Sequence, residues 1–199
     1  MLLAPIDSLE KALARLPGFG HRSAMRAALA LVREPARLSE PLEAALALAR
    51  SQVCACSRCG GFTVKDRDPC DMCTDERRDG TVLCIVEEAS DIVSLEATGA
   101  FKGRYHALGG KLSPSHRMGP EQLRIPQLVE RVRREGFSEV LLALSTDMDG
   151  DATALYIAEL LRDTDVKVTR LAFGLPADSG IAYSDPLTLR RAIQWRQNV

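Results

Sequence analysis

Apolar residues recur at helical spacing through the first quarter of the chain. Between residues 6 and 16 they follow one another at steps of three and four, and residues 23–32 and 39 to about 51 have the same helical spacing. The breaker Pro-Gly-Phe-Gly at 17–20 and Pro35 separate these stretches. The pattern therefore predicts three helices and no strand, with Ser39 capping the third helix.

From residue 81 the pattern changes to short apolar runs that alternate with helical segments. Strand-like runs lie at 81–86, 104–108, 139–144 and 166–173, and helical spacing at 90–97, 126–135, 152–161 and 187–195. Such alternation is typical of a mostly parallel sheet with helices on both faces. We therefore expect the α/β class for this part, followed by a helical tail.

The composition is that of a globular protein with one or two domains. The chain has 199 residues, 46% of them hydrophobic and 27% charged, with a formal net charge of -1. No apolar run approaches the roughly 18 residues that a membrane-spanning helix needs. The first six residues lack the basic and apolar regions of a secretory signal, so a cytoplasmic protein is expected.

The near-neutral charge conceals a basic stretch. Between residues 11 and 33 the chain has five basic residues and no acidic one. Within it, LPGFGHRSAMR at 16–26 predicts a hairpin whose glycines leave backbone N–H groups free at the start of a helix, a typical phosphate-binding arrangement. Arg22 and Arg26 are four residues apart, so both would flank the same phosphates. The alternative is a plain helical corner whose arginines are solvated.

Four cysteines have the spacing of a metal site. Cys56-x2-Cys59 and Cys70-x2-Cys73 are two pairs separated by ten residues, and two such pairs complete a tetrahedral zinc site. With four protein ligands this zinc would be structural. Disulfides and unligated buried thiols are the alternatives.

Carboxylates follow two of the predicted strands. Glu87 follows the first strand, and Asp147, Asp149 and Asp151 follow the strand that ends near residue 144. Sites of open α/β sheets lie at these carboxyl ends, and converging carboxylates commonly hold Mg²⁺. The alternative is a solvated acidic turn in which Asp151 caps the next helix. The nearby GGKLS at 109–113 lacks the full phosphate-loop spacing, so no nucleotide site is expected there.

Taken together, these segments resemble the RecR family of bacterial recombination mediators. The resemblance is carried in order by LPGFGHRSAMR, CSRCGGFTVKDRDPCDMC, TDERRDGTVLCIVEEASDI, GRYHALGGKLSP, MGPEQL, GDATALYIAELL and VTRLAFGLP, nearly end to end. It implies an N-terminal helix-hairpin-helix domain over 1–53, a four-cysteine zinc finger over 54–77, a Toprim domain over 78–175 and a C-terminal oligomerisation segment over 176–199.

The resemblance also implies a function and roles for particular residues. Members of the family form ring-shaped tetramers that can encircle DNA, and they work with RecO, and in many bacteria RecF, to load RecA onto gapped DNA. By position, Arg22 and Arg26 match the hairpin residues that contact DNA, the four cysteines match the zinc ligands, and Glu87 matches the Toprim glutamate. The function expected is that of a non-enzymatic clamp and adaptor; the alternative is a Toprim-type Mg²⁺-dependent nuclease or strand-passing enzyme.

The chain departs from the family in the acidic segment. It reads STDMDGDATA where members usually read something like NPTVEGEATA. Alignment on Gly150 puts Asp149 and Asp151 at the two acidic positions of the family, makes Asp147 an additional acid, and leaves Ser145 where Toprim enzymes have their first aspartate.

Overall fold

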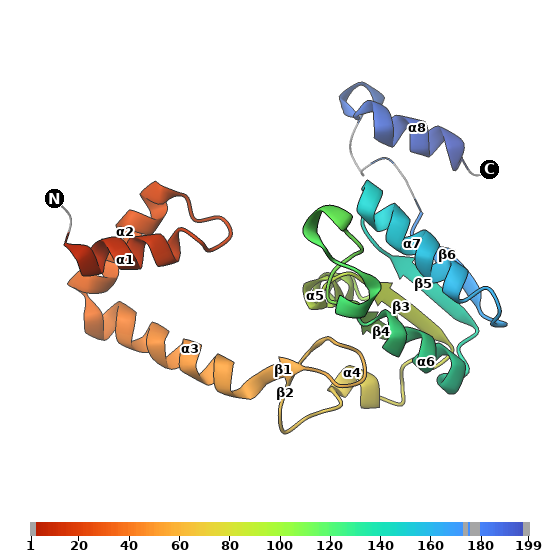
Figure 1. Cartoon of the computed structure of the whole chain (residues 1–199), viewed down its shortest axis with the longest axis horizontal. Coiled ribbons are helices and arrows are strands. Elements are labelled where there is room, and N and C mark those ends of the chain that lie inside the picture. Colours follow the sequence, from red (N-terminus) through yellow and green to blue (C-terminus); the bar gives the residue numbers. More distant parts are fainter. Residues whose placement is uncertain (1–2, 173–174, 176–179, 197–199) are drawn as a thin grey trace. The chain divides into compact units, whose positions relative to one another are not determined.

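The computed structural model describes residues 3–172, 175 and 180–196, and it divides the chain into two compact units (Figure 1). The first unit is Met1–Val53 and the second is Cys54–Val199. Within the described residues, every helix is too short or too polar to cross a lipid bilayer.

The first unit is entirely helical. It consists of α1 (Ala4–Leu13), α2 (His21–Arg33), a π-helical turn (Pro35–Ser39) and α3 (Glu40–Gln52). The small side chains of Ala24 and Ala28 on α2 are fully buried, which allows α1 and α2 to pack closely.

The predicted cap at the start of the third helix is wrong. Ser39 lies within a helical path that already begins at Pro35, and its hydroxyl donates to the carbonyls of Leu31 and Pro35 at 3.3 Å instead of accepting a bond from a helix N–H. Proline suits the first turn of a helix because it has no N–H to leave unsatisfied.

The second unit contains the predicted parallel sheet. Its strands are β3 (Val82–Val86), β4 (Arg104–Ala107), β5 (Glu139–Ala143) and β6 (Lys167–Arg170), in the order β4-β3-β5-β6, and every neighbouring pair is parallel. All four carboxyl ends therefore lie along one edge. The last strand ends at Arg170, before its predicted end; residues 171 and 172 are not in a strand, and residue 173 lies outside the described residues.

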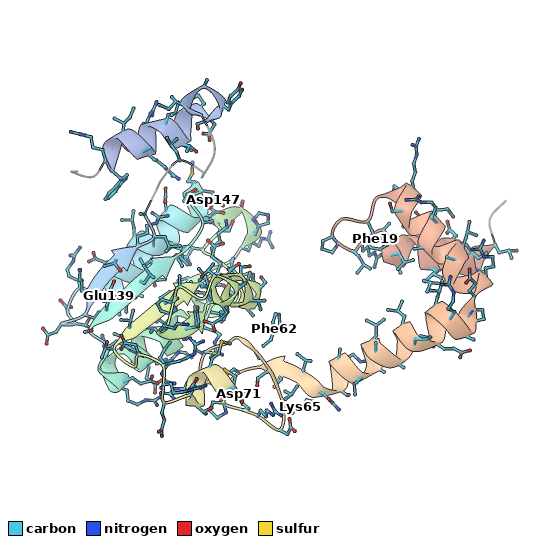
Figure 2. The ribbon with its side chains drawn as sticks, turned by 180° about the vertical axis from the view of Figure 1, so that it is seen from behind. Phe19, Phe62, Lys65, Asp71, Glu139 and Asp147 are labelled. Atoms are coloured by element: carbon cyan, nitrogen blue, oxygen red, sulfur yellow. The ribbon has the colours of Figure 1, made fainter. Side chains whose placement is uncertain are left out.

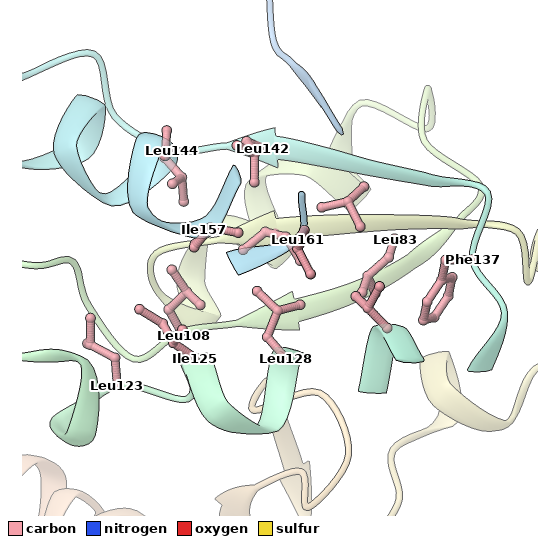
Figure 3. Close-up of a cluster of buried hydrophobic side chains, with 14 residues drawn as sticks. Leu83, Leu108, Leu123, Ile125, Leu128, Phe137, Leu142, Leu144, Ile157 and Leu161 are labelled. Carbon is pink, nitrogen blue, oxygen red and sulfur yellow. The ribbon is translucent and has the colours of Figure 1, made fainter. Parts of the chain in front are cut away.

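Helices cover both faces of this sheet, as the sequence predicts. They are α5 (Ala89–Ala97), α6 (Ile125–Glu135) and α7 (Met148–Leu160), and α8 (Pro186–Gln194) follows in the tail. Leu83 on β3 points toward α6 and α7 (Figure 3), and Ile85 on the same face belongs to the same larger core. Cys84 and Val86 point to the opposite face, toward α5.

The cysteine-rich segment has little regular structure. It contains β1 (Val53–Ala55), β2 (Phe62–Val64), which pairs with β1, and the single turn α4 (Asp71–Thr74). Short 3-10 turns at Pro114–His116, Pro120–Gln122 and Ile181–Tyr183 complete the fold.

Candidate functional site

The hairpin between α1 and α2 presents two arginines to solvent. Gly18 adopts a φ of +80°, which favours glycine, and Gly20 caps α2 in an extended conformation. Phe19 lies in this loop (Figure 2). Arg22 and Arg26 follow one turn apart on α2, both exposed, and within the described residues neither forms an ion pair. Their charge is therefore available to an anion.

A buried carboxylate orients the start of α2. Glu10 of α1 is almost inaccessible to solvent, and its Oε1 lies 2.9 Å from Nδ1 of His21. Because His21 begins α2, this contact ties α2 to α1 immediately before Arg22. The sequence predicts no role for either residue, since they are eleven positions apart.

The four cysteines of the two pairs converge on one point. All four are buried, and their sulfur atoms lie within 4.8 Å of one another. Sγ of Cys56 is 3.9 Å from Sγ of Cys73, and that of Cys59 is 3.6 Å from that of Cys70. Four sulfurs at about 2.3 Å from a tetrahedral zinc ion would be separated by about 3.8 Å, so the cluster fits a metal ion such as zinc.

The backbone around these sulfurs is arranged as in a metal knuckle. The N–H of Gly61 donates to Sγ of Cys59 and that of Cys70 to Sγ of Cys56, both at 3.3 Å. Gly60 adopts a φ of +76°, and a Cβ there would approach the carbonyl oxygen of Ala107 to 2.7 Å. Glycine is therefore required at this turn for conformation and for space.

Hydrogen bonds among the buried sulfurs shift the pKa values of three of the four thiols. Hydrogen bonding to Cys70, together with burial, raises the pKa of Cys59 to about 12, and the neighbouring sulfurs raise the pKa of Cys73 as well. Hydrogen bonds from Cys59 and Cys73 lower the pKa of Cys70. A bound divalent cation would allow all four sulfurs to be thiolates. All six cysteines of the chain are unpaired, so the disulfide alternative is wrong.

The cysteine loops are anchored to the sheet by backbone carbonyls. The N–H of Ala107, at the end of β4, donates to the carbonyl of Cys59 at 2.7 Å, and the guanidinium of Arg124 donates to that of Ser57 at 2.8 Å. Arg58 in turn forms an ion pair with Glu135 at 2.9 Å. A segment without an apolar core of its own is thereby fixed against the sheet.

The acidic residues lie at the carboxyl edge of the sheet. Glu87 directly follows β3, and its Oε1 accepts a hydrogen bond from the N–H of Ser145 at 2.6 Å. Asp147 precedes α7, and its Oδ1 accepts from the N–H of Gly150 at 2.8 Å. Lys111 forms ion pairs with both carboxylates.

The four carboxylates do not converge. Asp151 pairs with Arg170 at 2.6 Å and with Arg191 at 3.0 Å, while Asp149 lies half-buried in the first turn of α7. In the described part of the chain the cysteine cluster is the one group of three or more possible ligands whose atoms lie close enough for an ion. The suggestion that Asp151 caps α7 is wrong: Asp147 is the cap, and α7 begins at Met148 instead of residue 152.

Lys111 is the residue of this edge that could not be predicted from the sequence. Its one signal was its position in GGKLS, which lies just after β4 and therefore at the carboxyl edge. The spacing of that segment excludes a phosphate-binding loop but gives no sign of a partner 36 positions away.

Comparisons with known proteins agree with this arrangement. A Toprim domain model matches residues 81–172, which include the whole sheet. Recombination protein RecR of Moorella thermoacetica is 46% identical over 195 residues, covering 98% of this chain and 97% of that protein. The proteins of the same name from Methylocella silvestris and Cereibacter sphaeroides are 47% and 46% identical and cover 96% of this chain and 94% and 96% of their own lengths.

Proposed function

This chain belongs to the RecR family of recombination proteins, and on that premise we propose that it is a non-enzymatic mediator of DNA repair. It acts as a sequence-independent clamp on double-stranded or gapped DNA and helps RecO, with RecF where that partner is present, to load RecA. Its relatives are named as recombination proteins and not as enzymes. We place this activity in the cytoplasm, where DNA and reduced cysteines occur together.

The observation that carries the proposal is the free cationic face at the start of α2. Arg22 and Arg26 are exposed and without acidic partners among the described residues, and Arg22 lies in the first turn of α2, where the backbone N–H groups have no intrahelical acceptor. Guanidinium and backbone N–H groups of this kind contact phosphates and do not distinguish bases. We assign DNA contact to these two arginines.

Apolar side chains on the first unit support self-association. Helix α3 has no buried residue, and Leu42, Leu46 and Leu48 on it are exposed, as are Leu29 and Val32 on α2. A second copy of the chain would cover them. We propose a ring-shaped homotetramer, with a dimer as the smaller possible assembly and residues 176–199 contributing to subunit contacts. Several hairpins in one ring would add their weak DNA affinities by effective concentration.

We propose one structural zinc ion per chain, held by Cys56, Cys59, Cys70 and Cys73. The near-tetrahedral sulfur separations and the N–H groups directed at two of the sulfurs support this assignment. Four protein ligands leave no position for substrate, so the ion would hold residues 54–77 in shape and take no part in chemistry.

Residues 1–53 and 78–175 are then the helix-hairpin-helix and Toprim domains.

A RecA-loading assay tests the function. Gapped DNA coated with single-strand-binding protein is incubated with RecO and RecA, and the lag before DNA-dependent ATP hydrolysis is measured. The wild-type chain should shorten the lag, and the double variant Arg22→Ala with Arg26→Ala should not, although its native mass is unchanged. The control double variant Arg33→Ala with Arg37→Ala removes the same charge from residues that pair with Glu34 and should retain activity.

Two results would contradict this proposal. Full stimulation by the Arg22→Ala and Arg26→Ala variant would show that the hairpin is not the DNA contact. Cleavage of nicked or gapped DNA in Mg²⁺ or Mn²⁺ that disappears in Glu87→Gln would show a nuclease instead of an adaptor.

A further inference from the structure

Lys111 brings together the ends of three neighbouring strands. It follows β4, Glu87 follows β3, and Ser145 and Asp147 follow β5. Because these parallel strands are adjacent in the order β4-β3-β5, their carboxyl ends meet at the edge of the sheet where α/β proteins place their ligands. Asp147 marks this edge in Figure 2, and Glu139, at the start of β5, marks the opposite one.

The ammonium group of Lys111 occupies the space between the acidic side chains. Nζ donates to Oγ of Ser145 at 3.0 Å and to the carboxylate of Asp147, and it lies 3.7 Å from Oε2 of Glu87. An ammonium group has three N–H donors, and these three acceptors surround it. The side chains of Lys111 and Glu87 are 28% and 16% exposed, so solvent screens their contact less than that of a surface pair, whereas the side chain of Asp147 is 55% exposed.

The backbone on both sides of Lys111 is held in place. The N–H groups of Gly109 and Gly110 both donate to the carbonyl of Glu87 at 2.9 Å. On the other side, the N–H of Leu112 donates to Oγ1 of the buried Thr153 at 2.9 Å. The side chain of Lys111 therefore starts from a fixed point beside the two carboxylates.

We propose that Lys111 is a built-in counterion that takes the place of a divalent cation at the acidic edge of this Toprim sheet, so that the centre keeps its shape without Mg²⁺ and excludes that ion. The charged forms of both partners are favoured: the bond to Asp147 raises the pKa of Lys111, and the bond from Lys111 lowers the pKa of Asp147 to about 2.

The carboxylates at this edge do not fit Mg²⁺. Mg²⁺ requires near-octahedral oxygen coordination. In Glu87 and Asp147 one oxygen of each carboxylate already accepts a backbone N–H, and the other faces the ammonium group. Asp151 is engaged by two arginines. A divalent ion could approach Glu87 and Asp147 only after Lys111 had left.

Removal of the ammonium group should therefore create a cation site. In Lys111→Met the carboxylates of Glu87 and Asp147 would lie close together without a counterion, and a divalent cation would relieve their repulsion. Mn²⁺ is a suitable probe because it prefers oxygen ligands to thiolates and is detected directly by electron paramagnetic resonance.

The experiment is a titration of the full, zinc-loaded chain with Mn²⁺, with the free ion measured by its resonance signal. Wild type and the control Lys102→Met, which removes an exposed lysine away from this edge, should show no site tighter than about 1 mM. Lys111→Met should gain one site at least about tenfold tighter, which the additional change Asp147→Asn removes.

The proposal is overturned if wild type binds Mn²⁺ as tightly as Lys111→Met, or if Lys111→Met gains no site. Should Lys111→Met fail to fold, as judged by circular dichroism, wild type and Asp147→Asn decide the matter. If the wild-type chain binds Mn²⁺ and Asp147→Asn abolishes this binding, the proposal is refuted. If both proteins bind Mn²⁺ equally weakly, the proposal is supported. The titration contains no DNA, so its outcome is independent of the proposed clamp.

Discussion

Replacement of Arg22 and Arg26 by alanine should change the salt dependence of DNA binding as well as its strength. Both side chains are exposed on α2, and neither has an acidic partner among the described residues. An arginine that neutralises a phosphate releases a condensed counterion from DNA, so its removal lowers the slope of log K against log salt concentration.

The size of the effect follows from the number of contacts. Each phosphate contact with duplex DNA contributes about 0.9 to the slope, so two arginines contribute about 1.8 for every hairpin that engages the duplex. Between 50 and 200 mM salt, a slope difference of about 1.8 corresponds to about a twelvefold difference in the loss of affinity. The wild-type chain should therefore lose about twelvefold more affinity over this range than the double variant, and more if several hairpins of a ring bind at once.

Fluorescence anisotropy with duplexes of several sequences measures both quantities. The weakening should be the same for every duplex, because phosphate contacts carry no base information. The matched control is Arg33→Ala with Arg37→Ala, since both guanidinium groups pair with Glu34 and their charge is partly neutralised. A double variant of Arg22 and Arg26 with the wild-type slope, or a control that lowers the slope equally, would refute the assignment of DNA contact to this face.

Three further predictions concern the second unit. Burial lowers the pKa of His106 from 6.5 to about 4, so between pH 6.5 and pH 4 only the unfolded state gains a proton at this residue. Acidification across this range should therefore lower the free energy of unfolding by roughly 3 kcal/mol. Thermal unfolding measured at several pH values should show this loss for the wild-type chain and not for His106→Gln. Thr153→Val keeps the side-chain volume but leaves the N–H of Leu112 without its acceptor. This should lower the free energy of unfolding, measured in urea, by about 1–3 kcal/mol. An unchanged urea midpoint would show that this hydrogen bond does not matter for stability. Cys59→Ser, or treatment with a chelator, should lower the melting temperature and speed proteolysis within residues 54–77. An unchanged melting temperature and cleavage rate would show that the fold does not depend on a metal at the cysteine cluster.

The parts of this protein that could be predicted from sequence are those with a local physical cause. The cysteine pairs are recognisable because two intervening residues bring both sulfurs of a pair to one side of a turn. Arg22 and Arg26 share a face because four residues are about one helical turn. The strands β3 and β5 are recognisable because residues buried on both faces form continuous apolar runs.

Other features could not be predicted because they join residues far apart in the chain. Glu10 contacts His21 across eleven positions, and Lys111 contacts Asp147 across 36. Asp147, and not Asp151, caps α7 because the chain leaving β5 passes Asp147 in an extended conformation and turns into the helix at Met148. The spacing of apolar residues in the sequence does not indicate at which residue the chain turns from the strand into the helix.

The sequence by itself therefore determined the family, the element types, the two cysteine pairs and the basic hairpin, since each depends on residue type and short spacing. Only the tertiary structure decided the strand order β4-β3-β5-β6, and with it which charged side chains meet at the carboxyl edge. The physical reason is that electrostatic pairing depends on distance in space, and this distance is set by the packing of both sheet faces and not by separation along the chain.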